Sequence, residues 1–315
     1  MSLLNSLMPL KNPHHQGIAV DLIYRYDPHL PLQIDTATDA ESAMRILCDG
    51  NRRLTSVVAQ MQKATLGGES DGEIIVPICP VSLGLPLWAG AISTQQPYAL
   101  VLGCSDARVP VEPIFDQSFN DLFVVRIAGN VLGTECLGSV DFAVRHFAES
   151  LKLVVVLGHT GCGAVSAAVE TYLSPKDYAT IAFTHALRSL VDRIMIAVRG
   201  AADAIQHVCG RNVVHHPHYK DALKEVTVYL NAAITSFDLR REVAAFGKDS
   251  MRVVYGVYDL ATLFVTATPT PHPTDPSFAN APQQDELTEL AQKLAQAVVD
   301  KGVLGNRIDV WNKIG

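Results

Sequence analysis

The sequence lacks any apolar stretch long enough to cross a membrane. Its longest apolar runs, such as residues 153–157, suit β-strands and fall far short of the ~20 residues that a spanning helix needs. Polybasic runs and patches that interleave basic with aromatic side chains are also missing, and the net charge is −7. We therefore expect neither a membrane nor nucleic acid among the partners of this chain.

Nothing at the start of the chain resembles a secretory leader, because the first 16 residues lack a positive region and are interrupted by Pro9. We therefore expect a cytoplasmic protein. Cysteine is too scarce for a disulfide scaffold, with six residues in a chain of 315. In a reducing compartment such thiols are metal ligands, catalytic groups or small core residues.

What the sequence does contain is typical of a globular protein, with 48% hydrophobic and 18% charged residues. A chain of 315 residues holds one large domain or two small ones. We expect an N-terminal arm over residues 1–37, a main domain over 38–266, and a Pro-rich linker with a final helix over 267–315. No internal repeat is found.

Short apolar runs rich in β-branched residues alternate with helical patterns through the main domain. The runs predicted as strands are 98–103, 122–127, 151–158 and 251–258, and a helical pattern covers 138–151. Continuous apolar runs fit strands that are buried on both faces. We therefore predict an α/β fold with a mostly parallel central sheet flanked by helices.

Other segments are less regular. The letters "TDAE" predict a capping box from Thr38 to Glu41 and a helix that starts there. Residues 67–97 are rich in Gly and Pro and are expected to be mostly loop, whereas 171–246 is expected to be largely helical. The final helix carries one apolar stripe, made of Leu287, Leu290, Leu294 and Val298.

Two polar stretches begin where predicted strands end. "GCSDARVP" places Cys104, Asp106 and Arg108 after one strand, and "GHTGC" places His159 and Cys162 after another. In open α/β sheets, ligands bind beyond the carboxyl ends of the strands. The two stretches are therefore candidates for one shared site.

Cys104, His159 and Cys162 together offer two thiolates and one imidazole. Zinc accepts these ligands, and three protein ligands with an open fourth position are typical of a catalytic zinc. Gly161 and Gly163 would let the backbone bend closely beside the ligands. A single cysteine after a strand is more often a core residue, and "HTGC" alone could be an ordinary turn. Their occurrence at two strand ends favours a metal site, with one Zn²⁺ per chain.

Asp106 and Arg108 alternate with Cys104 and would project to the same side of an extended segment. An arginine fork would keep Asp106 ionised and fixed, and Asp106 could then orient a hydroxide by accepting its hydrogen bond. The alternative is an ordinary surface ion pair.

The motifs "CSDARVP" and "HTGCGAV" resemble those of the β-class carbonic anhydrases. The segments "IFDQSFNDLFVVRIAGNV" and "GSVDFAVRHFAESLKLVVVLGH" between them also match that family. The resemblance covers roughly residues 40–265 and is densest over 95–170. It implies the family's fold, here with an N-terminal helical arm and a C-terminal extension. It also implies a zinc lyase that converts carbon dioxide reversibly to bicarbonate and a proton, as a homodimer or higher even oligomer.

Carried over onto this sequence, the resemblance implies the zinc ligands Cys104, His159 and Cys162 and the catalytic pair Asp106 and Arg108. In an inactive state at lower pH, Asp106 would leave Arg108 and become the fourth zinc ligand. The substrate pocket would comprise Gln95, Phe123, Phe142, Gly161 and Gly163. Because the family's pocket lies at a dimer interface, Gln95 and the aromatic side chains would serve the zinc of the neighbouring subunit.

Three positions depart from the family's pattern. Ala107 replaces a serine without loss of a role, and Phe142 stands where tyrosine is usual, which removes a hydroxyl. Val101 stands where one branch of the family has the tryptophan of an inhibitory bicarbonate site, so no such site is expected.

Two other functions stay open on the sequence alone. The same zinc site could hydrolyse carbon disulfide or carbonyl sulfide, since access to the pocket, which separates these substrates, is set by loops and oligomer packing. The chain could also be a non-catalytic zinc-binding assembly module with its unusual termini as the working parts.

Overall fold

The computed structural model describes residues 21–27, 29, 36–65, 73–77, 84, 90, 92, 94–181, 183–247 and 251–305. The chain divides into two compact units, Met1–Leu32 with Ser56–Cys79, and Gln33–Thr55 with Pro80–Gly315. Among the described helices, none is both long and apolar enough to span a bilayer.

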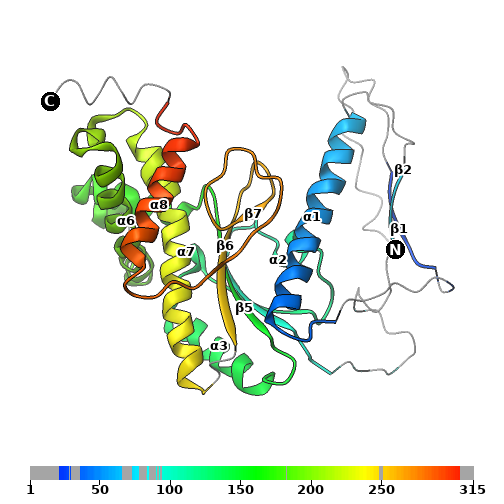
Figure 1. Cartoon of the computed structure of the whole chain (residues 1–315). Helices are drawn as coiled ribbons and strands as arrows, with labels where there is room; N and C mark the ends of the chain where they lie inside the picture. Colours follow the sequence, from blue (N-terminus) through cyan, green and yellow to red (C-terminus); the bar gives the residue numbers. More distant parts are fainter. Residues whose placement is uncertain are drawn as a thin grey trace. The chain divides into compact units, whose positions relative to one another are not determined.

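The larger unit is built on a sheet of order β4-β3-β5-β6-β7, with β8 paired to β6, and Figure 1 labels its strands β5, β6 and β7. Its strands are β3 (Ala99–Gly103), β4 (Leu122–Arg126), β5 (Leu153–His159), β6 (Arg252–Tyr258), β7 (Val265–Thr266) and β8 (Ala279–Asn280). The four strands from β4 to β6 are parallel, whereas β7 and β8 run antiparallel to β6. The predicted α/β fold with a mostly parallel sheet is confirmed.

The helices of the larger unit follow the strands along the chain. They are α1 (Ala40–Thr65, of which the part to Thr55 belongs here), α2 (Val111–Ile114), α3 (Thr134–His146), α4 (Gly163–Leu173), α5 (Tyr178–Ile181), α6 (His185–Cys209), α7 (Tyr219–Ala245) and α8 (Leu287–Asp300). Short 3₁₀ turns occur at η3 (Ala128–Asn130), η4 (Pro175–Asp177) and η5 (Arg211–His215). The helix expected over 138–151 begins and ends earlier, as α3, because Phe147 terminates it.

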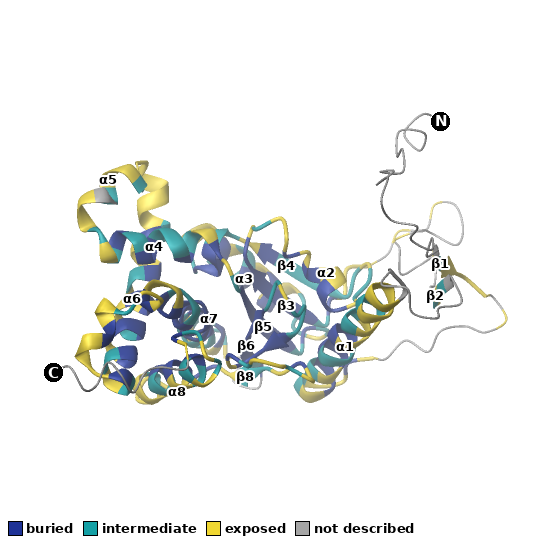
Figure 2. Cartoon of the chain, turned by 90° about the horizontal axis from the view of Figure 1, so that it is seen from above, coloured by how far each residue is buried: buried dark blue, intermediate teal, exposed yellow. Residues whose placement is uncertain are grey.

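Both faces of the central strands β3, β5 and β6 are buried, which explains why these strands read as continuous apolar runs. On β3, Leu100 and Leu102 face one apolar cluster, whereas Ala99 and Val101 face another. The first cluster includes buried residues of α3, α4, α6, α7 and α8, and the second those of α1 and α2. Figure 2 shows the dark blue strands between these two groups of helices.

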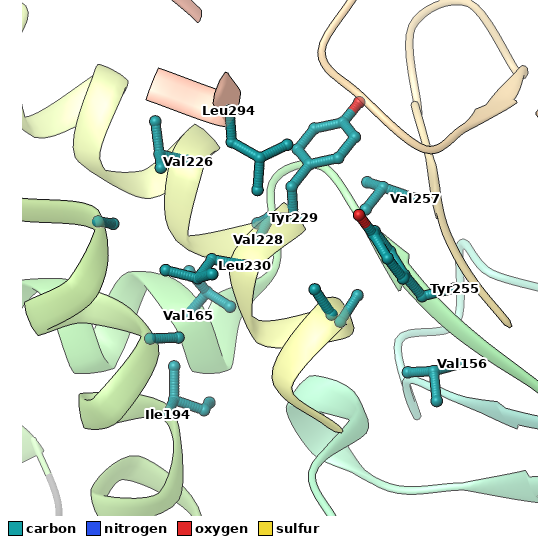
Figure 3. Packing of buried hydrophobic residues seen from close by; sticks show 14 of the residues in the cluster. Val156, Val165, Ile194, Val226, Val228, Tyr229, Leu230, Tyr255, Val257 and Leu294 are labelled. Atoms are coloured by element: carbon teal, nitrogen blue, oxygen red, sulfur yellow. The ribbon is translucent and has the colours of Figure 1, made fainter. Parts of the chain in front are cut away.

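The helices of the long region 171–246 are part of the main core. Figure 3 shows side chains of α4, α6, α7 and α8 gathered with those of β5 and β6. Tyr229 of α7 and Leu294 of α8 are almost fully buried there, and the Tyr229 hydroxyl lies 3.1 Å from Oγ1 of Thr266. The final helix therefore packs through its predicted apolar stripe onto α6, α7 and the sheet.

The start of α1 differs in detail from the expected capping box. Asp39, not Thr38, caps the helix: its Oδ1 accepts from the backbone N–H of Ser42 at 2.7 Å. Ser42 Oγ accepts in return from the N–H of Asp39 at 3.0 Å. Glu41 points elsewhere and binds Arg252 at 2.6 Å. The box is thus shifted by one residue, because Glu41 pairs with Arg252 and Ser42 makes the return bond instead.

The smaller unit contains a parallel two-stranded sheet of β1 (Asp21–Arg25) and β2 (Glu73–Pro77). The sequence predicts an arm over 1–37 and mostly loop over 67–97, and neither prediction includes these two strands. The rest of the expected arm, residues 1–20, 28 and 30–35, lies outside the described residues. Ile23 and Ile75 are partners in the register of this sheet.

Candidate metal centre

The two predicted motif loops meet at one edge of the sheet. β3 and β5 are parallel neighbours, with Gly103 opposite Leu157. Cys104 directly follows β3, and His159 is the last residue of β5. Cys162 stands at the residue before the first turn of α4. Parallel pairing thus brings the ends of two distant segments together, as the sequence predicted.

Cys104, His159 and Cys162 form a compact and buried ligand set. Their thiol and imidazole ligand atoms all lie within 4.8 Å of one another, and all three residues are buried. Two thiols and one imidazole gathered around one point are a donor set that fits zinc. Gly161, in the turn between two of the ligands, has a φ of +66°, which favours glycine.

The imidazole of His159 is oriented for a metal. Its Nδ1 lies 2.9 Å from the carbonyl oxygen of Thr160, and since a carbonyl can only accept, Nδ1 carries the proton. Nε2 is therefore left with a free lone pair, and this buried atom has no hydrogen-bond partner. A buried acceptor without a partner is costly, so an ion bound at Nε2 explains it.

The two thiols are electrostatically coupled. A hydrogen bond from Cys162 lowers the pKa of Cys104, while the facing Cys104 sulfur and burial raise the pKa of Cys162. Cys104 is therefore the more acidic of the two thiols. A divalent cation that bound both sulfurs would hold them as thiolates, which are the zinc-binding form.

Asp106 and Arg108 form a bidentate pair beside the ligands. Arg108 Nε donates to Oδ1 at 3.0 Å and Nη2 to Oδ2 at 2.7 Å. These hydrogen bonds hold the pKa of Asp106 well below its usual range. Asp106 Oδ2 lies 3.8 Å from Nε2 of His159, so the carboxylate stands next to the position of a bound ion. The Asp106 side chain is 18% exposed and that of Arg108 is 59% exposed, so Arg108 reaches solvent while Asp106 is largely covered.

Arg126, the last residue of β4, holds the loop that carries Cys104 and Asp106. Its Nε donates to the carbonyl of Cys104 at 2.9 Å, and its Nη2 donates to the carbonyl of Asp106 at 2.6 Å. Both backbone carbonyls of the loop are thereby fixed by one planar guanidinium. We did not single out Arg126 in the sequence. The signal that marks Arg126 is its position: it stands at the end of a strand, as the polar residues of the two motifs do.

The predicted pocket residues fall into separate groups. Gly161 is tied to the site, because its carbonyl accepts from Arg108 Nη2 at 3.3 Å, and Gly163 opens α4. Phe123 and Phe142 lie together, with ring centroids 6.5 Å apart, and Phe142 is 47% exposed. Gln95 is exposed in a loop that Asn120 holds through the carbonyl of Thr94 and the N–H of Gln96.

The fold and this ligand set define an α/β protein with a metal centre at the carboxyl edge of its sheet. A family model described as "Carbonic anhydrase" matches residues 99–262, which is more than half of the chain and includes all three ligands. The chain therefore belongs to the carbonic anhydrase family, and the resemblance to its β class is confirmed.

Curated relatives carry the name of this family. Carbonic anhydrase 2 of Mycobacterium tuberculosis is 49% identical over 81 residues, which is 26% of this chain and 38% of that protein. A carbonic anhydrase of Mycolicibacterium smegmatis is 45% identical over 94 residues, 30% of this chain and 44% of that protein. The chain thus spans about two fifths of the length of these relatives. The β-carbonic anhydrase CafA of Aspergillus fumigatus matches with a TM-score of 0.43 and 21% identity, over 63% of this chain and 83% of that one.

Proposed function

We propose that the protein is a zinc enzyme that converts carbon dioxide reversibly to bicarbonate and a proton. The observation that carries this proposal is the combination of a buried Cys–His–Cys ligand set with a bidentate aspartate–arginine pair at its side. The ligand set alone would serve many reactions. An ionised carboxylate held 3.8 Å from a ligand nitrogen suits a reaction that needs an oriented water-derived nucleophile.

Zinc held by Cys104, His159 and Cys162 would lower the pKa of a water molecule and so supply a nucleophile near neutral pH. Asp106 accepts a hydrogen bond from that nucleophile and turns its lone pair towards the carbon of carbon dioxide. Arg108 keeps Asp106 ionised and fixed, so that this acceptor is in place before substrate arrives. The side chain of Arg108 reaches solvent, and the proton leaves to buffer or water.

Replacement of Asp106 tests the proposal directly. Asp106→Asn keeps the shape of the side chain but removes its charge and half of its acceptor capacity. We expect stopped-flow hydration of carbon dioxide to fall by about 10² or more while zinc stays bound at one ion per chain. Asp116→Asn is the matched control, because Asp116 forms an exposed pair with Arg53. An Asp106→Asn variant that hydrates carbon dioxide like the wild type would disprove the role.

The alternatives give distinct results in the same assay. A zinc-loaded wild type that is inactive on carbon dioxide but hydrolyses carbon disulfide or carbonyl sulfide would identify the sulfur-containing substrates. A zinc-loaded wild type without turnover of any of the three would identify a non-catalytic module. The bidentate Asp106–Arg108 pair favours catalysis, since a structural zinc has no use for an ionised carboxylate fixed beside it.

We further propose that the enzyme is a homodimer or a higher even oligomer. Phe142 supports this, because nearly half of a large apolar side chain is exposed beside Phe123 and Phe147. A partner subunit would cover it and place Gln95 near the neighbouring zinc. Light scattering of wild type and of Phe142→Glu tests this: we expect an even oligomer that the charge dissociates. A monomeric wild type would refute it.

A further inference from the structure

Asn231 lies in the middle of α7 and is 4% exposed. Its Nδ2 donates at 2.9 Å to the carbonyl of Gly129, which is 102 residues earlier in the chain. Two other buried polar residues of α7 behave differently, since Thr227 and Ser236 both donate to carbonyls of their own helix. The side-chain amide of Asn231 thus forms its hydrogen bond with the turn η3, at the metal-binding edge of the sheet.

Gly129 connects this amide to the metal centre. Its own N–H donates to Sγ of Cys104 at 3.3 Å. Its φ is +70°, and a Cβ at this position would lie 2.8 Å from Cδ1 of Ile194 and 3.1 Å from Cβ of Ala164. Only glycine fits between α6 and α4 with this backbone direction. A hydrogen bond on its carbonyl side and one on its amide side therefore fix the same residue.

We propose that Asn231 is a positioning residue of the metal centre, which holds Gly129 so that the Gly129 N–H stays bonded to the Cys104 sulfur. The inference rests on the proposed zinc chemistry. An N–H bond to a thiolate draws electron density from the sulfur, so that the sulfur gives less charge to the metal. A metal that receives less charge acidifies water more strongly. Asn231 thereby extends the working range of the enzyme towards neutral pH, and α7 gains a role beyond packing.

Asn231→Leu tests this role, because leucine has the same number and branching of side-chain heavy atoms but no donor. Thr227→Val is the matched control, since Thr227 is buried one turn earlier and bonds only within α7. With cobalt in place of zinc, we expect the thiolate-to-metal absorption band to move to lower energy in Asn231→Leu and to stay unchanged in Thr227→Val. In the zinc enzymes, we expect the pH profile of hydration to move to higher pH and activity at neutral pH to fall about tenfold in Asn231→Leu alone.

A folded Asn231→Leu protein with the wild-type band and the wild-type pH profile would overturn the inference. Should this variant not fold, Asn231→Ser takes its place. A second measurement uses the wild-type protein and needs no variant. With cadmium-113 bound to the wild type, an N–H bond to a ligand sulfur gives a spin coupling between cadmium and the Gly129 amide proton. Absence of that coupling would also overturn the inference. A band shift in a protein that hydrates no carbon dioxide would instead count against the proposed function alone.

Discussion

Arg108 binds both carboxylate oxygens of Asp106 and also donates to the carbonyl of Gly161 at 3.3 Å. One guanidinium thus joins the loop that follows β3 to the turn that carries Cys162. The five donors of arginine are arranged in a plane, so the three bonds are made without strain by one rigid group. Loss of this geometry would change both the orientation of the Asp106 carboxylate and its distance from the three metal-binding residues.

Arg108→Lys is therefore expected to impair turnover although it keeps the charge. A lysine ammonium cannot bind two carboxylate oxygens in a plane, so Asp106 loses its fixed direction. We expect kcat/KM for hydration to fall by about 10²-fold, with zinc content unchanged. Arg53→Lys is the control, because the partner of Arg53 is the exposed Asp116. Equal activity of Arg108→Lys and wild type would show that charge alone is needed.

Arg126→Met is expected to weaken the zinc site itself. Without the guanidinium, the carbonyls of Cys104 and Asp106 lose their two charged donors, and the ligand loop is less well held. We expect zinc affinity, measured by competition with a chelator, to fall by about tenfold. Arg193→Met is a matched control, because Arg193 also donates to a backbone carbonyl, that of Leu132 at 2.8 Å. An affinity loss of the same size in both variants would mean that the effect is general destabilisation.

The ligands could be predicted from the sequence because each stands at the end of a strong local pattern. The runs ending at Gly103 and Gly158 are apolar and β-branched, and parallel strands carry their ends to one edge. The link from Asn231 through Gly129 to Cys104 could not be predicted. It joins residues that are far apart in sequence, and Asn231 stands in an apolar helical run where nothing local marks its partner.

The short strands β1 and β2 could not be predicted from the sequence for a related reason. The letters "EIIVP" of β2 give only five residues of pattern between segments rich in Gly and Pro. The partner strand β1 is equally short, and the parallel pairing joins two segments that are far apart in the sequence. The shift of the α1 cap from Thr38 to Asp39 depends on which side chain reaches back, Ser42 or Glu41, and Glu41 is taken by Arg252 on a strand distant in sequence.

The start of α1 should respond to acid. The hydrogen bond from the Ser42 N–H lowers the pKa of Asp39. A lowered pKa in the folded state means a contribution to stability that is present above the unfolded pKa of about 4 and is lost as the pH falls through the folded value. Asp39→Asn keeps a good cap without the charge. We expect the urea midpoint of wild type to fall more steeply below about pH 4 than that of Asp39→Asn. Parallel curves for the two proteins would contradict this.

The end of α8 is held by a charged cluster of three largely buried side chains. Nζ of Lys301 lies 2.7 Å from Oε1 of Glu225 on α7 and 3.7 Å from Oδ2 of Asp259, the residue after β6. Asp259 in turn shapes the next turn, since its Oδ1 accepts from the N–H groups of Ala261 and Thr262. Removing the ammonium leaves two carboxylates to face each other with little water between them, which raises the free energy of the folded state.

Lys301→Met should therefore lower the free energy of unfolding by about 2 kcal/mol, less than for a fully buried pair because water still reaches the cluster. Urea denaturation followed by circular dichroism measures it. Lys293→Met on the same helix is the control, because Lys293 and Glu289 form an exposed pair, and its unfolding free energy should hardly change. Adding Glu225→Gln to Lys301→Met should restore part of the loss, since one of the two facing charges is then gone. If the double variant were less stable than Lys301→Met, repulsion between the carboxylates would not be the cause, and lost packing of the lysine stem would be.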